Sequence, residues 1–235
     1  MIDVDMSVFK KTKSSKKFRL NDLVSEGKGQ TISYGMIYSL VIEIYIYFLD
    51  KDEEISEMKA PYENIILILE GSLNISTEPP TEISAGDVYV VPEETDVRIM
   101  ATKPVKYASI LLPMEGELIK NLDVSTKMKA KEMVSYRPGQ VVNLTLVNNP
   151  GLNLSVISMD AGEGLNTHTA PGDAMVIALD GEGKITIGGE EFDIKEGESI
   201  IMPKDIPHAV FGVTQFKMIL VLVKNAEANR PMVPT

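Results

Sequence analysis

Residues 24–30, Val-Ser-Glu-Gly-Lys-Gly-Gln, return 110 positions later as residues 134–140, Val-Ser-Tyr-Arg-Pro-Gly-Gln. The shift of 110 continues without a gap to Ile75 and Ile185, and this stretch contains 11 identities. After one inserted residue, a shift of 111 aligns Ile83, Gly86, Pro92, Lys106 and Leu111 with Ile194, Gly197, Pro203, Lys217 and Leu222. An internal repeat of this length indicates two tandem copies of one domain.

The repeat sets the domain boundaries that we expect. A length of 235 residues fits one or two domains at roughly 150 residues each. We divide the chain into an N-terminal arm (1–19), a first repeat (20–117), a linker (118–127), a second repeat (128–225) and a C-terminal tail (226–235). The arm carries the chain's one basic cluster, between Lys10 and Lys17, and we expect this cluster to be solvated.

Both repeats have the pattern of β-strands. Short apolar or alternating runs in the second repeat are separated by Gly-containing turns, and no long segment has a helical period. The strands that we expect there are 152–159, 174–179, 184–187, 191–194, 199–202 and 216–223. Evenly spaced short strands predict an all-β sandwich or closed barrel in each repeat.

Composition excludes several classes of function. The chain is 44% hydrophobic and 24% charged, with a formal net charge of -11 and no Cys. An acidic surface disfavours nucleic acid and anionic membranes as partners. The absence of Cys excludes disulfides, thiolate metal sites and Cys nucleophiles. The acidic start of the chain does not resemble a signal peptide, so we expect a cytoplasmic protein.

The second repeat contains a motif built around the only two His residues of the chain. It reads Gly164-Leu-Asn-Thr-His168, then Gly181, then Gly197, with Pro203-Lys-Asp-Ile-Pro-His208 following. This pattern resembles the two motifs of the cupin family, G…HxHxxxE…G and GxxxxxPxGxxHxxxN. The resemblance implies two jelly-roll barrels of the double-stranded β-helix type in one chain, a bicupin. It also implies a divalent metal held by three His and one Glu.

Only half of the implied metal ligands are present. His168 occupies the first His position and His208 occupies the His position of the second motif. Ala170 replaces the second His, and Ala174 replaces the Glu. Imidazole is a common ligand of transition metals, so His168 and His208 are the candidate ligands of Zn, Mn, Fe or Ni. Two protein ligands are fewer than the three of a usual catalytic zinc site, so we expect the metal to be held loosely.

The alternative is a pair of inherited His residues that bind no metal and only form hydrogen bonds in a cavity. Asp173 is the nearest carboxylate, but strand alternation directs it away from the barrel if Ala174 points inward. Small residues at 170 and 174 leave room for a small organic ligand. Met175, Met202 and Phe211 are candidates to line its site together with Asp173, and the other interpretation of these three apolar residues is core packing.

The first repeat lacks this chemistry. Met58 and Val97 occupy the positions of His168 and His208, and such side chains do not form a transition-metal site. We expect this repeat to serve packing or dimerisation, because Tyr38, Tyr45, Tyr47 and Phe48 crowd its early strands and the family resemblance implies a homodimer.

Three hypotheses about function stay open at this stage. The first is a metal-assisted isomerase, lyase or oxygenase of small-molecule metabolism that works in the second barrel. The second is a binding or sensing module that holds a small-molecule ligand without turnover, and the third is a purely structural assembly. No organic cofactor is indicated, and the fold alone does not decide between the three.

Overall fold

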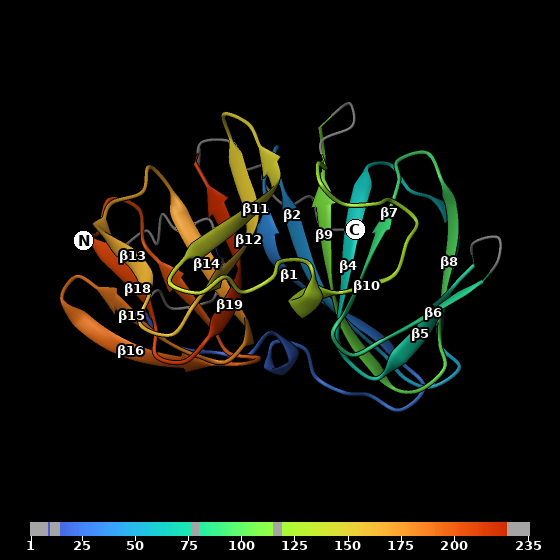
Figure 1. Ribbon diagram of the computed structural model, residues 1–235. Helices are drawn as coiled ribbons and strands as arrows, with labels where there is room; N and C mark the ends of the chain where they lie inside the picture. The colour runs from blue at the N-terminus through green and yellow to red at the C-terminus, as the bar shows by residue number, and fades with distance from the viewer. Residues whose placement is uncertain (1–8, 10–14, 77–79, 115–118, 225–235) are drawn as a thin grey trace, which may run out of the picture. The chain divides into compact units, whose positions relative to one another are not determined.

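The computed structural model is all-β, and it describes residues 9, 15–76, 80–114 and 119–224 (Figure 1). These residues form two compact units. The N-terminal unit contains residues 19–36 and 42–133, and the C-terminal unit contains the described residues up to 18, residues 37–41 and residues 134–224. No helix in the described part of the chain is long and apolar enough to cross a membrane.

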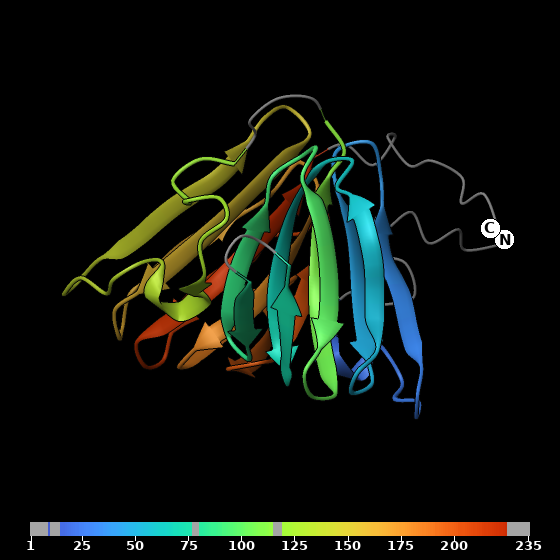
Figure 2. The ribbon, with the colours of Figure 1, turned by 90° about the vertical axis from the view of Figure 1, so that its right-hand side faces the viewer.

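The N-terminal unit is a pair of antiparallel sheets. Figure 2 looks onto the smaller sheet of this pair, with the larger sheet behind it. The order of the larger sheet is β1 (Thr31–Tyr38), β2 (Glu43–Leu49), β9 (Val105–Leu112), β4 (Glu63–Glu70), β7 (Asp87–Val91) and β10 (Met128–Lys129). The smaller sheet has the order β3 (Glu54–Lys59), β8 (Asp96–Ala101), β5 (Ser72–Ile75) and β6 (Thr81–Ser84).

The C-terminal unit repeats this arrangement. Its larger sheet has the order β11 (Val141–Asn148), β12 (Leu152–Met159), β19 (Phe216–Val223), β14 (Asp173–Asp180) and β17 (Ser199–Met202). Its smaller sheet has the order β13 (Gly164–His168), β18 (His208–Gly212), β15 (Glu182–Ile187) and β16 (Glu190–Lys195). Two pairs of antiparallel sheets confirm the prediction of two tandem barrels.

The shifts of 110 and 111 that align the sequence also align the structure. Strand β4 precedes β14 by 110 positions and β9 precedes β19 by 111. The same shift relates two short 3-10 helices, η1 (Leu20–Asp22) and η2 (Ala130–Glu132). The internal repeat is therefore a repeat of the fold.

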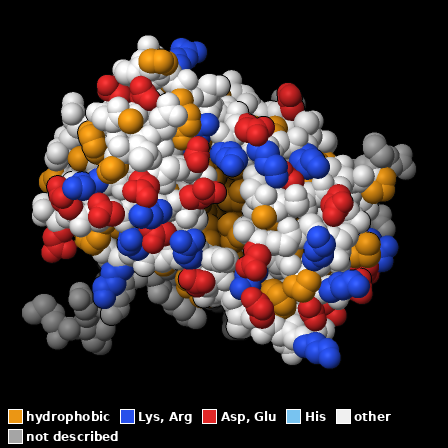
Figure 3. Space-filling view, turned by 60° about the horizontal axis from the view of Figure 1, so that its bottom comes forward, with side chains coloured by type: hydrophobic (Ala, Val, Ile, Leu, Met, Phe, Trp, Pro, Cys, Tyr) orange, Lys and Arg blue, Asp and Glu red, His pale blue; other side chains and the backbone are white. Residues whose placement is uncertain are grey.

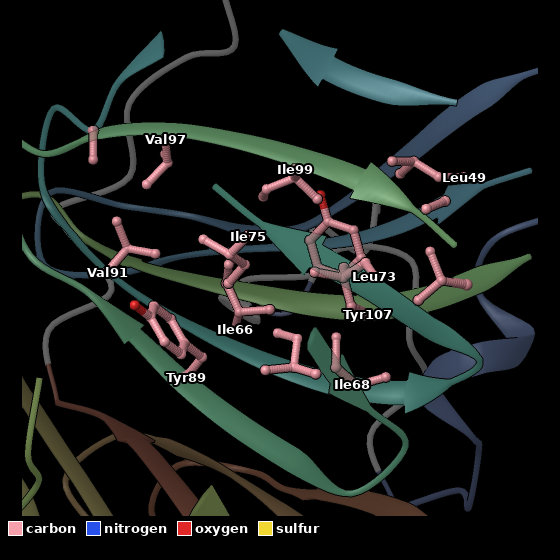
Figure 4. Packing of buried hydrophobic residues seen from close by; sticks show 14 residues of the cluster. Leu49, Ile66, Ile68, Leu73, Ile75, Tyr89, Val91, Val97, Ile99 and Tyr107 are labelled. Atoms are coloured by element: carbon pink, nitrogen blue, oxygen red, sulfur yellow. The ribbon is translucent and has the colours of Figure 1, made fainter. Parts of the chain in front are cut away.

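Each barrel encloses a core of apolar side chains between its two sheets. In the N-terminal unit, Tyr89, Tyr107, Ile66 and Ile75 point into this interior from both sheets (Figure 4). The C-terminal unit uses alternate residues of β14 in the same way, so that Ala174, Val176 and Ala178 belong to its core. Alternation along the strands thus decides which side chains face the inside of each barrel.

The sequence analysis located six strands of the C-terminal unit and missed three. The strands 152–159, 199–202 and 216–223 are observed with the expected ends, and each of the other three expected strands is two residues longer than expected. The missed strands are β11, β13 and β18. Strands β13 and β18 are the two that carry the His residues.

The N-terminal arm is not wholly solvated, in contrast to our expectation. Phe9 is fully buried, and the backbone of Ser15 and Phe18 bonds to strand β17 of the C-terminal unit. Lys17 forms an ion pair with Glu198. Residues 10–14 of the basic cluster and the C-terminal tail 226–235 lie outside the described residues. The described linker residues join the N-terminal unit.

Candidate functional site

Strands β13 and β18 bring the two His residues together at one edge of the smaller C-terminal sheet (Figure 1). Their Cα atoms are direct cross-strand partners. The register shifts between Leu165 and His168, which marks a β-bulge or a similar irregularity. Such irregularities re-aim side chains, and here the shift places His168 opposite His208.

The two imidazole rings lie in contact and present the same nitrogen. Their centroids are 4.6 Å apart and their planes make an angle of 65°. The Nδ1 atom of His168 is 2.8 Å from the carbonyl oxygen of Asn166, and that of His208 is 2.8 Å from the carbonyl oxygen of Ile206. Because a carbonyl oxygen only accepts, each Nδ1 must carry its proton and donate. In the neutral ring, the lone pair is then on Nε2.

The rings differ in their exposure to solvent. His208 is buried, with 2% of its surface exposed, whereas His168 is exposed. Burial lowers the pKa of His208 below its ordinary value, and the neighbouring His168 lowers this pKa further. His208 is therefore neutral at physiological pH, which is the form that binds metals.

The carboxylate of Asp173 bonds to the backbone of a neighbouring turn. Its neighbour Ala174 faces the core of the barrel, so the carboxylate of Asp173 is on the opposite face of β14. Asp173 Oδ1 accepts a hydrogen bond of 2.8 Å from the backbone N–H of Lys204. This bond ties β14 to the turn that leads into β18. That Asp173 lines a ligand site stays a prediction.

The three apolar candidates lie in different places. Met202 is buried in the core of the barrel and is the cross-strand partner of Ala174. Met175 is buried on the other face of β14, together with Asp173. Phe211 is 44% exposed and lies on the outer face of β18, because Val210 faces the core. Of the three, only Met202 belongs to the core cluster of the barrel, and the assignment of these residues to a ligand site stays a prediction.

The donor set fits a metal only in part. Two imidazoles with fixed Nδ1–H groups are suitable ligands, because metal-binding His commonly donates its second N–H to a backbone carbonyl or a carboxylate. No group of three or more His, Asp or Glu that could hold a metal ion occurs among the described residues. Any metal here would complete its coordination with water or with a bound ligand.

Sequence reasoning missed the groups that orient the rings. The carbonyl oxygens of Asn166 and Ile206 belong to the backbone, so no side-chain pattern identifies them. Both, however, precede their His by two residues. A second missed group is Asp205, which has a positive φ of 60° and donates its N–H to the carbonyl oxygen of Ala170. Asp205 occupies the position of the motif's Gly.

Charged side chains of both signs are mixed on the visible surface. Figure 3 shows Lys and Arg scattered among Asp and Glu on the face that it displays. A nucleic-acid interface usually requires a clustered basic patch. The expectation that nucleic acid is not a partner stays a prediction.

Comparisons with known proteins agree with this structure. Residues 155–224 match the Cupin domain family model. The "Cupin 2 conserved barrel domain protein" of Leptotrichia buccalis is 32% identical, with 91% of this chain and 99% of that chain covered and a TM-score of 0.80. The chain therefore belongs to the cupin family, and its two barrels make it a bicupin.

A more distant similarity extends over most of the chain. The salicylate 1,2-dioxygenase of Pseudaminobacter salicylatoxidans is 14% identical, with 93% of this chain and 87% of that chain covered and a TM-score of 0.64. At this identity, the similarity concerns the fold alone. No functionally curated protein matches the chain.

Proposed function

We propose that the C-terminal barrel binds a divalent transition metal through Nε2 of His168 and His208, and that this metal binds a small organic ligand. The observation that carries this proposal is the matched pair of Nδ1–H···O=C bonds. Both bonds leave Nε2 as the basic nitrogen of a ring whose neighbour is 4.6 Å away. Two such nitrogens suit Zn, Mn, Fe or Ni.

The charge of this site favours an anionic ligand. Two neutral imidazoles leave the full charge of a divalent ion uncompensated, and the position of the family's Glu is occupied by Ala174. The core around Met202 and Ala174 consists of apolar side chains. A ligand with an apolar body and oxygen donors at one end would satisfy both conditions. Small carboxylic acids with a second oxygen donor are therefore the substrate class that we test first.

Such a metal centre would support an enzyme of small-molecule metabolism. A bound metal polarises the oxygen atoms of its ligand and orients the ligand for reaction. His168 is exposed and provides the accessible side of the site, whereas His208 is buried and held in one orientation. The choice between isomerase, lyase and oxygenase rests on substrate screening. Salicylate and gentisate are reasonable first probes, because the distantly similar dioxygenase is named for salicylate and has been solved with gentisate.

The test is the metal content of the purified chain, without a His tag or chelator, measured by elemental mass spectrometry. We expect up to one equivalent of a first-row metal per chain after incubation with Zn, Mn, Fe or Ni. The His168→Ala/His208→Ala variant should bind less than a tenth of this amount, and the matched control Met202→Leu should retain it. Less than a tenth of an equivalent in the unaltered protein would refute the metal site.

The second candidate function is a metal-free binding module. It is favoured because no third His, Asp or Glu among the described residues completes a metal-holding group with the His pair. Two neutral rings then act as hydrogen-bonding groups for an organic ligand. Salicylate or gentisate binding that persists with a chelator, measured by calorimetry and lost in His208→Ala, would support this function over the first.

A further inference from the structure

The interior of the N-terminal barrel carries a cluster of polar side chains on its larger sheet. Strands β2, β9, β4 and β7 lie next to one another in that sheet. Tyr89 and its cross-strand partner Ile66 belong to the core. The same row continues from Ile66 to Ser109 and from Ser109 to Tyr45. Because cross-strand partners face the same side of a sheet, Ser109 and Tyr45 also face the interior.

The next row of this sheet adds an amide and an acid to the interior. Val91 belongs to the core and pairs with Asn64. Asn64 pairs with Leu111, which in turn pairs with Glu43. Asn64, Leu111 and Glu43 are partly exposed, whereas Tyr89 in the first row is 1% exposed. The polar cluster therefore begins in the core and reaches solvent, and its members are Glu43, Tyr45, Asn64, Tyr89 and Ser109.

Two hydrogen bonds orient the members of this cluster. Ser109 Oγ donates to Asn64 Oδ1 at 2.9 Å, and Tyr45 Oη donates to Glu43 Oε2 at 3.1 Å. The first bond turns the oxygen of the Asn64 amide toward Ser109, so the amide NH2 group is directed away from Ser109 as a donor. A carboxylate accepts several hydrogen bonds, so Glu43 can accept one from a ligand in addition to that from Tyr45.

Tyr89 contributes a polar atom that no described side chain engages. Its hydroxyl is buried and has no hydrogen-bond partner among the residues that the structure describes. Figure 4 shows this hydroxyl at the end of the interior where Val91 and Val97 lie. Val91 is in the row of Asn64, so the hydroxyl is directed toward the amide and the acid. Buried polar groups are nearly always hydrogen-bonded, and this one indicates a place for a bound molecule.

Charge and aromatic rings determine which molecule suits this interior. Burial raises the pKa of Tyr47, and the negative charge of Glu43 raises this pKa further. The rings of Tyr47 and Tyr107 are stacked with their centroids 5.0 Å apart, and the ring of Tyr45 is 6.2 Å from that of Tyr47. The described inward-facing residues of β2, β9, β4 and β7 include no Lys, Arg or His. A carboxylate and aromatic faces attract a cation and repel an anion.

We propose that the interior of the N-terminal barrel binds a small aromatic amine in its protonated, cationic form. The ammonium group bonds to the carboxylate of Glu43, and the ring of the ligand lies against the tyrosine rings of β2. A hydroxyl at the other end of the ligand bonds to Tyr89 and Asn64. The second repeat has Ile200 and Ala174 at the positions of Tyr89 and Asn64, so this site belongs to the first repeat and is independent of the His pair.

The test uses three probes that share one phenol ring and differ in charge. They are tyramine, a cation, tyrosol, which is neutral, and 4-hydroxyphenylacetate, an anion. Calorimetric titration of the full chain in the presence of a chelator measures the binding of each. We expect tyramine to bind with a dissociation constant of about 1 mM or tighter, and at least about tenfold more tightly than 4-hydroxyphenylacetate. If tyramine does not bind, or binds no more tightly than the anion, the proposal is overturned.

Isosteric substitutions test the two ends of the site. Glu43→Gln removes the charge and should weaken tyramine binding roughly tenfold or more, and Tyr89→Phe removes the buried hydroxyl and should weaken it roughly threefold or more. The matched controls are Glu82→Gln, which alters an exposed acid of the smaller sheet, and Tyr136→Phe in the C-terminal barrel. Both controls should bind tyramine as the unaltered chain does. Unchanged affinity in Glu43→Gln or in Tyr89→Phe would overturn the proposal.

Two further measurements address folding and the other barrel. Circular dichroism shows whether each variant folds, and Asn64→Ala replaces a variant that does not. Unchanged tyramine affinity in Asn64→Ala would equally overturn the proposal. The His168→Ala/His208→Ala variant should bind tyramine with the affinity of the unaltered chain. Loss of tyramine binding in this variant would assign the ligand to the C-terminal barrel and refute a site in the N-terminal one.

Discussion

The two barrels of this chain have the same backbone fold but differ in the residues at the positions of the His pair. Met58 and Val97 are cross-strand partners in the N-terminal barrel, as His168 and His208 are in the C-terminal barrel. A register shift precedes both pairs, between Ile55 and Met58 and between Leu165 and His168. The register that pairs these positions is thus present in both repeats, whereas the His side chains are present only in the C-terminal one.

A backbone carbonyl shows how the site depends on more than the two His residues. In the C-terminal barrel, the carbonyl oxygen of Ile206 accepts the Nδ1–H of His208. The equivalent carbonyl in the N-terminal barrel belongs to Thr95 and accepts the N–H of Ala60 at 2.9 Å. The group that orients the buried ring in one barrel is therefore already bonded in the other.

The interiors of the two barrels are also filled differently. Tyr89 and Tyr107 occupy the N-terminal core (Figure 4), where Ile200 and Met218 occupy the equivalent positions of the C-terminal core. Leu73 and Val105 of the N-terminal barrel correspond to Gly183 and Phe216. A Cβ on Gly183 would lie 3.0 Å from the ring of Phe216. Gly183 thus makes room for Phe216.

The largest expected effect comes from exchanging the residues that fill the core. Gly183→Leu should overpack the C-terminal core against Phe216 and cost about 1–3 kcal/mol of the free energy of unfolding. Phe216→Val should lower the free energy of unfolding by less than a buried Phe→Ala change does, which is about 3–5 kcal/mol. The double variant restores the pair found in the N-terminal barrel, so it should be at least about 1 kcal/mol more stable than the sum of the single effects predicts.

Chemical denaturation measures this coupling. The control is Gly183→Leu combined with Phe211→Val, because Phe211 is exposed on the outer face, and these two changes should be additive. If the effects of the Gly183 and Phe216 changes were additive, this would contradict the proposal that Gly183 makes room for the ring of Phe216.

The next effect concerns the transfer of the site from one barrel to the other. Met58→His and Val97→His, introduced together with His168→Ala and His208→Ala, should bind metal about 10- to 100-fold more weakly than the unaltered chain. The reason is that the Thr95 carbonyl is engaged, and loss of such orienting bonds costs about this factor. Competition with a chromophoric chelator measures the affinity. Equal affinity in both barrels would show that the orienting carbonyl is unimportant.

The fold was predictable from the sequence because the strand pattern occurs in both repeats. Apolar alternation and the shift of 110 or 111 occur twice, so each repeat supports the interpretation of the other. Strands β13 and β18 were missed because they are short, and because Gly164, Asn166 and Gly212 are poor strand formers. The strands that carry the candidate site therefore have the weakest strand pattern in the repeat.

The sequence predicted that the two His residues lie together, and strand parity decides which of the other candidates face the barrel interior. The argument that turned Asp173 away from the core applies equally to Met175, which lies two residues further along the same strand. It also applies to Phe211, three residues after the inward-facing His208. The pairing of Phe18 with Ser199 was not predictable, because these residues are far apart in the sequence and no local pattern joins them.

A smaller effect is expected in the dependence of stability on pH. The pKa of His208 is lower in the folded protein than its ordinary value of 6.5. The unfolded chain therefore binds more protons than the folded chain when the pH lies between these two pKa values, and stability falls as the pH falls through this window. The N-terminal barrel has Val97 at this position and contributes no such term.

This pH dependence is measured in the presence of a chelator, so that metal binding does not contribute. Denaturation between pH 7.5 and pH 5.5 should show a loss of stability in the unaltered chain that is smaller in His208→Asn. The same pH dependence in both proteins would contradict the assignment of this loss to His208.

The smallest effect concerns the N-terminal core. The hydroxyl of Tyr89 is buried and has no hydrogen-bond partner among the described residues. Removing an unsatisfied buried group removes its desolvation cost, so Tyr89→Phe should leave stability unchanged or raise it slightly. Tyr136→Phe is the contrasting control, because its hydroxyl donates to Asp180 at 2.9 Å, and this variant should lose stability. A loss in Tyr89→Phe equal to that in Tyr136→Phe would mean that the Tyr89 hydroxyl has a partner in solution, so that the N-terminal interior holds a polar molecule of its own.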